Sequence, residues 1–205
     1  MDVTRFFLGM HAATHAGEVS GGRTRGSDRW LGGLADGQLR ARPRPDLNSI
    51  VWLLWHMART EDVAVNLVVV GRAQVFDDTW ARRMRVDRPD MGTGMTPGEV
   101  AELSERVDVA AVRAYRSAVG VRTREVVPAL APERWDEVLG LDDTTRAAAA
   151  GAFGPNDEWL AGVGHRPWQG HTRGDQLGAT AIRHNAGHIG EAVTIRSLAG
   201  FAVGI

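Results

Sequence analysis

Apolar residues recur along much of this chain at the spacing of α-helices, and the longest apolar stretch runs from Leu47 to Val70. Arg59, Glu61 and Asp62 interrupt this stretch. Charged side chains are costly at the centre of a bilayer. The pattern therefore predicts a buried helix of a helical bundle, with no membrane partner.

Capping residues mark the ends of this helix and of a second one. Asn48 is a good N-cap residue for the first helix, and Gly71 stands where a C-terminal glycine is expected. The second helix is predicted from Pro97 to about Val127, because Thr96-Pro97-Gly98-Glu99 forms a capping box and Pro128 follows the last turn.

Two further helices are predicted near the chain ends. The first covers Asp2 to Val19 and resumes near Trp30 to Leu34, and the last covers Asp175 to Leu198, with Gly200 as its stop. A short helix is expected at Pro132–Val138.

The connections Arg72–Met95 and Gly140–Gly174 are long and lack the period-two alternation of strands, although a small hairpin stays open. We therefore predict an all-α four-helix bundle with long crossover connections.

The length of 205 residues fits a single domain over residues 1–205. Basic residues number 24 and acidic residues 25, so the net charge of −1 offers no electrostatic footprint for nucleic acid. All basic residues are arginine and cysteine is absent, which excludes a Schiff-base lysine and a cysteine nucleophile. The apolar run Phe6–Met10 is too short for a signal peptide, so we expect a cytoplasmic protein.

Histidine placement carries most of the functional information. His184 and His188 lie four residues apart and share one face of the last helix, and His56 lies on the apolar stripe of the Leu47–Val70 helix. Burying an unpartnered imidazole costs about 1–3 kcal/mol. A divalent cation would explain three such rings and leave one coordination position for water or substrate. The alternative is that each ring is an ordinary core or surface residue.

Other side chains are candidates for supporting roles. Glu191, Glu61, Asp62 and Asn185 are close enough in sequence to orient the imidazole rings.

His11 and His15 form a second pair at four-residue spacing on the first helix, either lining the same cavity or facing solvent or a partner. His165 and His171 are expected to be solvated loop residues.

Two stretches of the sequence together resemble the DinB/YfiT-like metalloenzyme superfamily. The first runs from Asn48 to Asp62 and contains Trp52, Trp55 and His56. The second, far downstream, is His184-Asn-Ala-Gly-His188-Ile-Gly-Glu191. The resemblance covers the helices from Leu47 to Leu198. It implies a four-helix bundle, often a homodimer, that holds zinc or nickel on three side chains. Those ligands fall on His56, His184 and His188.

Characterised members of that family use a low-molecular-weight thiol such as mycothiol or bacillithiol. In the mycothiol-dependent maleylpyruvate isomerase branch, the first residue of the last-helix pair is Glu, whereas it is His184 here. The resemblance therefore implies a metal-dependent thiol transferase or isomerase acting in detoxification, with a small-molecule electrophile and a thiol as partners, rather than that particular isomerase.

Several residues and functions stay open at this point. Glu191 or Glu61 is a candidate proton carrier, and Arg59 and Arg183 are candidates to hold a substrate carboxylate unless they are surface charges. Trp168, with Trp159, is a candidate lid. The alternative functions are a metal-dependent hydrolase, a non-catalytic metal- or ligand-binding stress protein, and an all-α dimerisation module.

Overall fold

The computed structural model describes residues 2–21, 27–155 and 168–202, and these ranges contain helices and no β-strand. The long helical segments are α1 (Val3–Ala12), α4 (Ile50–Asp62) continued by the π-helix η1 (Val63–Val70), α7 (Val109–Val126), and α10 (Arg173–Leu177) continued by the π-helix η4 (Gly178–His184) and α11 (Asn185–Leu198). The shorter elements are α2 (Ser27–Leu31), α3 (Asp36–Arg40), α5 (Asp78–Met84), α6 (Pro97–Arg106), α8 (Leu141–Ala149) and the 3₁₀ helices η2 (Val127–Ala129) and η3 (Pro132–Asp136).

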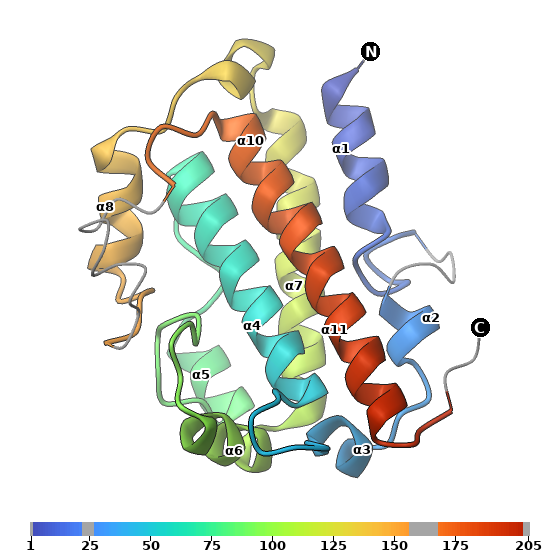
Figure 1. Cartoon of the computed structure of the whole chain (residues 1–205). Helices are drawn as coiled ribbons and strands as arrows, with labels where there is room; N and C mark the ends of the chain where they lie inside the picture. The colour runs from blue at the N-terminus through green and yellow to red at the C-terminus, as the bar shows by residue number, and fades with distance from the viewer. Residues whose placement is uncertain (1, 22–26, 156–167, 203–205) are drawn as a thin grey trace.

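The long segments form a bundle in which two consecutive members run in the same direction. In Figure 1, α4 and α7 both rise from the lower end of the molecule, whereas α1 and the α10–α11 segment descend. The connection from α4 to α7 must therefore return along the bundle, and it does so before α5, which lies with α6 at the lower end of the molecule in Figure 1. This arrangement confirms the predicted all-α fold with crossover topology.

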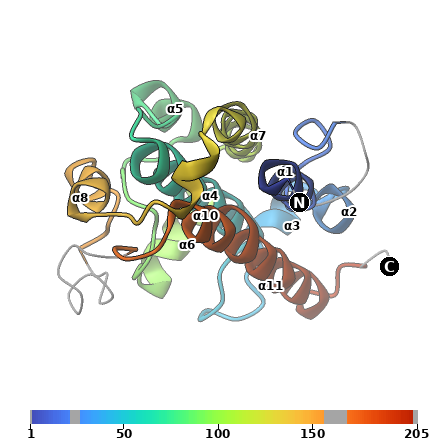
Figure 2. The ribbon, with the colours of Figure 1, turned by 90° about the horizontal axis from the view of Figure 1, so that it is seen from above.

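Helix α4 lies at the centre of the bundle, with α7, α8 and α11 around it (Figure 2). All 13 of its residues are buried, including its charged ones. Its N-cap is Ser49, whose hydroxyl accepts a hydrogen bond from Trp52 N, whereas the predicted cap Asn48 is used elsewhere. Gly71 ends the segment as predicted, in the left-handed conformation with φ 71°.

The predicted helix Pro97–Val127 is two helices in the structure, which is a correction. Asp108 accepts a hydrogen bond from Ala111 N and caps α7, while Val107 adopts an extended conformation. Arg40 donates hydrogen bonds to the carbonyls of Ser104, Glu105 and Val107 at the end of α6. These bonds satisfy carbonyl groups that a continuous helix would have paired internally.

The first helix is also shorter than predicted. It ends at Ala12 instead of Val19, because the backbone tightens into i→i+3 hydrogen bonds from Ala13 N to Met10 O and from Thr14 N to His11 O. His15 therefore follows the helix in a turn. The predicted resumption near Trp30 corresponds to α2, which begins at Ser27.

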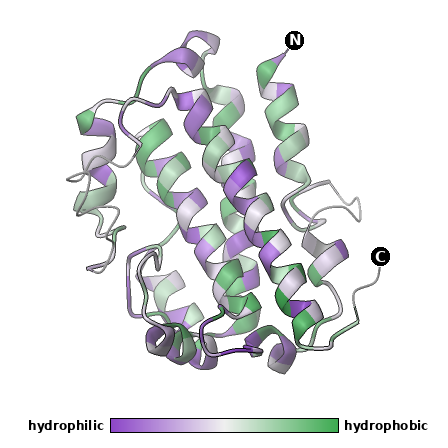
Figure 3. Ribbon diagram, viewed as in Figure 1, coloured by the Kyte–Doolittle hydropathy of each residue, from purple (hydrophilic) through white to green (hydrophobic). Residues whose placement is uncertain are grey.

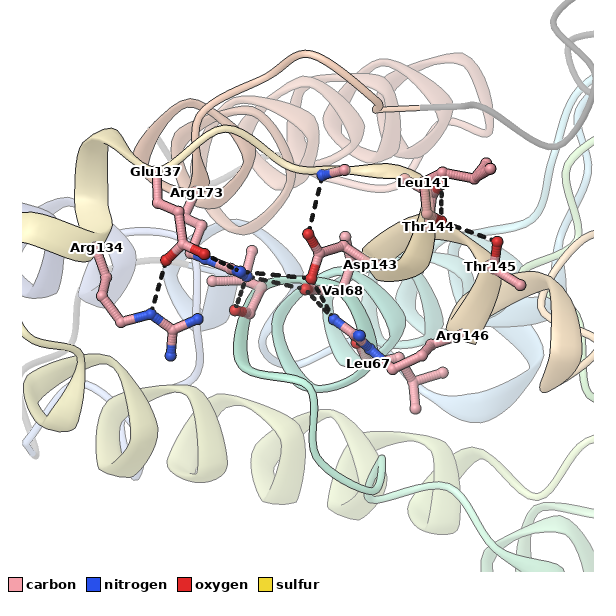
Figure 4. Close-up of polar contacts among 12 residues, drawn as sticks. Leu67, Val68, Arg134, Glu137, Leu141, Asp143, Thr144, Thr145, Arg146 and Arg173 are labelled. Atoms are coloured by element: carbon pink, nitrogen blue, oxygen red, sulfur yellow. Dashed lines mark hydrogen bonds and ion pairs between the residues drawn. The ribbon is translucent and has the colours of Figure 1, made fainter.

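A polar cluster holds α8 and α10 against the end of η1 (Figure 4). Arg173 donates to Val68 O at 3.3 Å and pairs with Glu137 at 2.9 Å and with Asp143 at 3.4 Å. Arg146 also donates to Val68 O at 3.3 Å. The two arginines thus satisfy carbonyls that the last turn of the central helix leaves without a backbone partner.

Within the described ranges, no helix combines the length and the apolar character that crossing a bilayer requires.

Candidate metal centre

Three imidazole rings meet between α4 and the last helical segment. His56 comes from α4, His184 ends η4 and His188 lies in α11. The ring centroids of His56 and His184 are 4.9 Å apart, those of His56 and His188 are 4.9 Å apart, and those of His184 and His188 are 4.4 Å apart. The structure thus brings together the three rings that helical spacing places on facing stripes.

In two of these rings, Nδ1 already makes a hydrogen bond to an oxygen atom. His56 Nδ1 donates to Met91 O at 2.6 Å, and His188 Nδ1 donates to Glu191 Oε2 at 2.7 Å. A proton on Nδ1 leaves the lone pair of a neutral ring on Nε2. His56 Nε2 lies 3.1 Å from His184 Nε2, so it faces the interior of the cluster.

Glu191 has a positioning role in this arrangement. Its Oε1 accepts a hydrogen bond from Asn48 Nδ2 at 3.0 Å, while its Oε2 accepts the one from His188. The hydrogen bond from His188 holds the pKa of Glu191 below its ordinary value. An ionised carboxylate therefore fixes the orientation of the His188 ring, which is the usual support for a metal-ligating histidine.

Burial keeps the rings of His56 and His184 neutral. Burial and, to a smaller extent, the neighbouring His184 lower the pKa of His56 to about 3, against the opposing effect of the Met91 carbonyl. Burial and the proximity of His188 lower the pKa of His184 to about 4. Neutral imidazoles with free lone pairs are the form in which histidine binds metals.

A cavity of about 390 Å³ adjoins the cluster. Among the described residues, its lining is His56, Thr60, Met91, Thr93, Phe153, Trp168, His171, Ala179, Thr180, Arg183 and His184. Trp168 has a positive φ of 72°, a strained conformation for a residue with a side chain, and its ring lies 5.9 Å from that of Phe153. Trp159, the other half of the predicted lid, lies outside the described residues.

A second buried cluster joins His11 and His15 to Glu61. His11 Nε2 lies 2.8 Å from Glu61 Oε1, and His15 Nε2 lies 2.8 Å from Glu61 Oε2. Thr123 Oγ1 donates to Oε1 and Asn185 Nδ2 to Oε2, both at 2.7 Å. Glu61 and Asn185 thus serve this second cluster, whereas their sequence positions made both of them candidate partners of the His56 centre.

The electrostatics of this second cluster differ from those of the first. Burial alone would raise the pKa of Glu61, but the adjacent His15 and His11 hold it well below its ordinary value. Burial lowers the pKa of His15 to about 4. The ligand atoms in each of the two clusters lie within 4.8 Å of one another, so both groups are geometrically able to hold a metal ion.

Arg59 and Asp62 belong to a structural network in the core. The Asp62 carboxylate accepts hydrogen bonds from Tyr115 Oη at 2.6 Å and from the backbone N of Val75 and Phe76 at 2.8 Å each. Arg59 is completely buried and donates to the Pro89 carbonyl at 2.6 Å. Arg59 is therefore neither a surface charge nor a residue of the cavity, and Asp62 orients none of the three rings.

Sequence reasoning missed several residues of the site. Met91 and Phe153 come from the long connections, whose position relative to α4 has no signature in the sequence. Asn48 was assigned to a cap because it stands at a helix start. The position of Thr60 could have been predicted from the sequence, because it follows His56 by one helical turn on the same face of the helix.

Comparisons with known proteins agree with the fold described above. The sequence matches the DinB superfamily over residues 23–192. The crystal structure of a conserved protein from Enterococcus faecalis shares the fold, with a TM-score of 0.65 and 20% sequence identity over 97% of each chain. A search of curated proteins finds no significant match. Because the family match spans well over half of the sequence, the chain belongs to the DinB superfamily.

Proposed function

We propose that this protein is a metal-dependent enzyme that joins an external low-molecular-weight thiol of the mycothiol type to a small electrophile. The observation that carries the proposal is the convergence of His56, His184 and His188 beside a cavity large enough for a small molecule. Ligand pockets of about 300–1,000 Å³ are typical of small-molecule sites.

The chemistry of the donor set favours the three-histidine cluster over the second one as the metal site. At His56 and His188 the Nδ1 proton has an acceptor, which leaves Nε2 free for a cation. Nδ1 of His184, of His11 and of His15 has no hydrogen-bond partner among the described residues, so the difference lies in the Nε2 atoms of His11 and His15, which already face Glu61. That carboxylate is satisfied without an ion.

Three imidazole ligands leave an open coordination position and suit zinc or nickel. A divalent cation held there would supply a positive charge that favours the thiolate over the thiol form of a bound nucleophile. The thiol must come from outside because the chain has no cysteine. Within the protein, Glu191 and the Met91 carbonyl keep two of the rings in the orientation that binding requires.

The first test measures metal content. Protein expressed without an affinity tag should contain about one zinc or nickel per chain by elemental analysis. His188→Ala should lose the metal, whereas His171→Ala, which removes an exposed histidine of the cavity wall, should retain it. Full retention of metal by His188→Ala would contradict the assignment of the site.

The second test measures turnover. Metal-loaded protein should consume mycothiol or bacillithiol in the presence of a reactive electrophile, and His188→Ala should lower the rate by at least about 100-fold. Mass spectrometry of products formed in ¹⁸O-labelled water separates the reactions. Solvent oxygen in the product without loss of thiol would indicate a hydrolase and contradict thiol transfer.

A further inference from the structure

Arg183 places a positive charge at the edge of the cavity beside the three histidines. It lies in η4 immediately before His184, is exposed, and lines the cavity. Among the described residues it has no hydrogen-bond or ion-pair partner, whereas the buried Arg59 and Arg173 are held by several acceptors each. Its guanidinium is therefore available to a ligand.

The rest of the described wall favours an anion. No Asp or Glu is among the described lining residues, so Arg183 is the one full charge in that lining. A cavity wall with one sign of charge selects ligands of the opposite sign. Guanidinium groups match carboxylates in particular, because two parallel N–H bonds reach both carboxylate oxygens.

Thr60 adds a buried polar group to the cavity lining. Its side-chain oxygen is buried, the residue is 6% exposed, and the oxygen has no hydrogen-bond partner among the described residues. Buried hydroxyls are almost always satisfied, so one that lines a cavity indicates a polar ligand or an ordered water molecule.

Part of the described cavity lining is apolar. Phe153 and Trp168 contribute two rings with an interplanar angle of 56°, and Met91 and Ala179 add aliphatic surface. The positive φ of Trp168 places strain in the backbone at this wall, a feature that concentrates at binding sites. This wall fits a flat apolar body.

We infer that the cavity binds a small aromatic carboxylate, whose charged group pairs with Arg183 and whose ring lies against Phe153 and Trp168. This inference deepens the proposed function, on which it rests, by assigning a chemical class to the electrophilic substrate. Its binding component stands independently of turnover, because Arg183 lies outside the metal-ligating set.

The test compares phenylacetate with phenylacetamide, which have nearly the same shape and differ in charge. Isothermal titration calorimetry measures both probes on the full chain, once loaded with zinc and once after dialysis against chelator. Wild-type protein should bind phenylacetate at least roughly tenfold more tightly than phenylacetamide in both states. Arg183→Gln should remove this preference and Arg183→Lys should keep part of it. Arg82→Gln, which removes an exposed arginine from α5, is the control of equal net charge and should keep all of it.

The outcomes separate this inference from the proposed function. If Arg183→Gln keeps the preference and removal of zinc abolishes it, the ion alone binds the carboxylate and the inference is wrong. Equal binding of the two probes by the wild type, or binding of neither, also overturns it. If the protein proves unable to hold a metal but retains an Arg183-dependent preference, the binding inference stands and the proposed function falls.

Discussion

At the scale of single residues, the two histidine clusters differ in which ring nitrogen is satisfied. His56 and His188 use Nδ1 for a hydrogen bond to an oxygen, whereas His11 and His15 direct Nε2 to the oxygens of Glu61. The first arrangement leaves nitrogen lone pairs facing one another at the centre. The second arrangement surrounds the Glu61 carboxylate with hydrogen-bond donors. Histidine side chains thus suit metal binding in the first cluster and stabilise a buried carboxylate in the second.

Glu191→Gln should weaken metal binding without unfolding the protein. The substitution replaces the carboxylate that orients His188 by a neutral amide, and loss of such a support typically lowers metal affinity by about 10–100-fold. Competition with a chromophoric chelator measures the dissociation constant. Asp142→Asn, at an exposed carboxylate of α8, should leave the constant unchanged; an equal loss in both variants would count against a specific role for Glu191.

The pKa of His15 makes a prediction about stability and pH. The pKa is about 4 in the folded state and 6.5 for an unperturbed histidine, so between these values the unfolded chain binds a proton that the folded chain does not. Stability should therefore fall as the pH falls from about 6.5 towards 4, with a contribution of up to about 1.4 kcal/mol per pH unit from this residue.

Urea unfolding of chelator-treated protein at pH 5 and pH 6 tests this expectation. His15→Gln should be less stable at both values, because Glu61 loses a partner, but its free energy of unfolding should change less between them than that of the wild type. An unchanged difference between the two pH values would show that His15 is protonated in both states or in neither.

At the scale of elements, the central helix depends on arginines for its C-terminal end. Arg173 and Arg146 reach the last carbonyls of η1 and tie α10 and α8 to them (Figure 4). These two helices flank the connection that supplies Phe153 and Trp168 to the cavity wall. The cluster therefore anchors the two helices on either side of this connection, and it contains none of the three histidines.

Arg173→Leu should destabilise the fold. The substitution leaves the Val68 and Val69 carbonyls without this donor, and an unsatisfied buried polar group costs about 1–3 kcal/mol. The free energy of unfolding, measured by chemical denaturation, should fall by about 3 kcal/mol in total. Arg134→Gln removes a solvent-accessible partner of Glu137 and should lower the free energy of unfolding by less than about 1 kcal/mol. Equal losses in the two variants would contradict the assigned role of the carbonyl contacts.

The elements also show what a sequence can predict. The helix ending at Gly71 and the paired rings of His184 and His188 followed from local signals, namely a glycine C-cap and four-residue spacing. The break at Asp108 did not, because it depends on Arg40 reaching carbonyls more than sixty residues away. The partners of Glu61 were missed for the same reason, since they come from separate segments of the chain.

At the scale of the whole molecule, a homodimer stays a prediction. Helix α1 lies at the outside of the bundle and is rich in hydrophobic residues (Figure 3). Val3, Phe6 and Met10 are 44%, 55% and 43% exposed. Exposed apolar residues concentrated on one helix are typical of an interface.

Light scattering coupled to size exclusion tests this prediction. The wild-type chain should have twice the monomer mass, and the double substitution Phe6→Glu and Met10→Glu should have the monomer mass with unchanged helical content by circular dichroism. Val121→Glu, at an exposed apolar residue of α7, is the control and should remain dimeric. A wild-type protein of monomer mass would refute the homodimer.

The two clusters are adjacent on both helices that build them. Glu61 lies five residues beyond His56, and Asn185, which donates to Glu61, directly follows His184. An ion held by His56 and His184 would therefore also restrain Asn185 and the Glu61 carboxylate, which contacts His11 of the N-terminal helix. Amide hydrogen exchange along residues 3–12 should consequently slow when the cation is added, although no residue of this helix belongs to the three-histidine cluster.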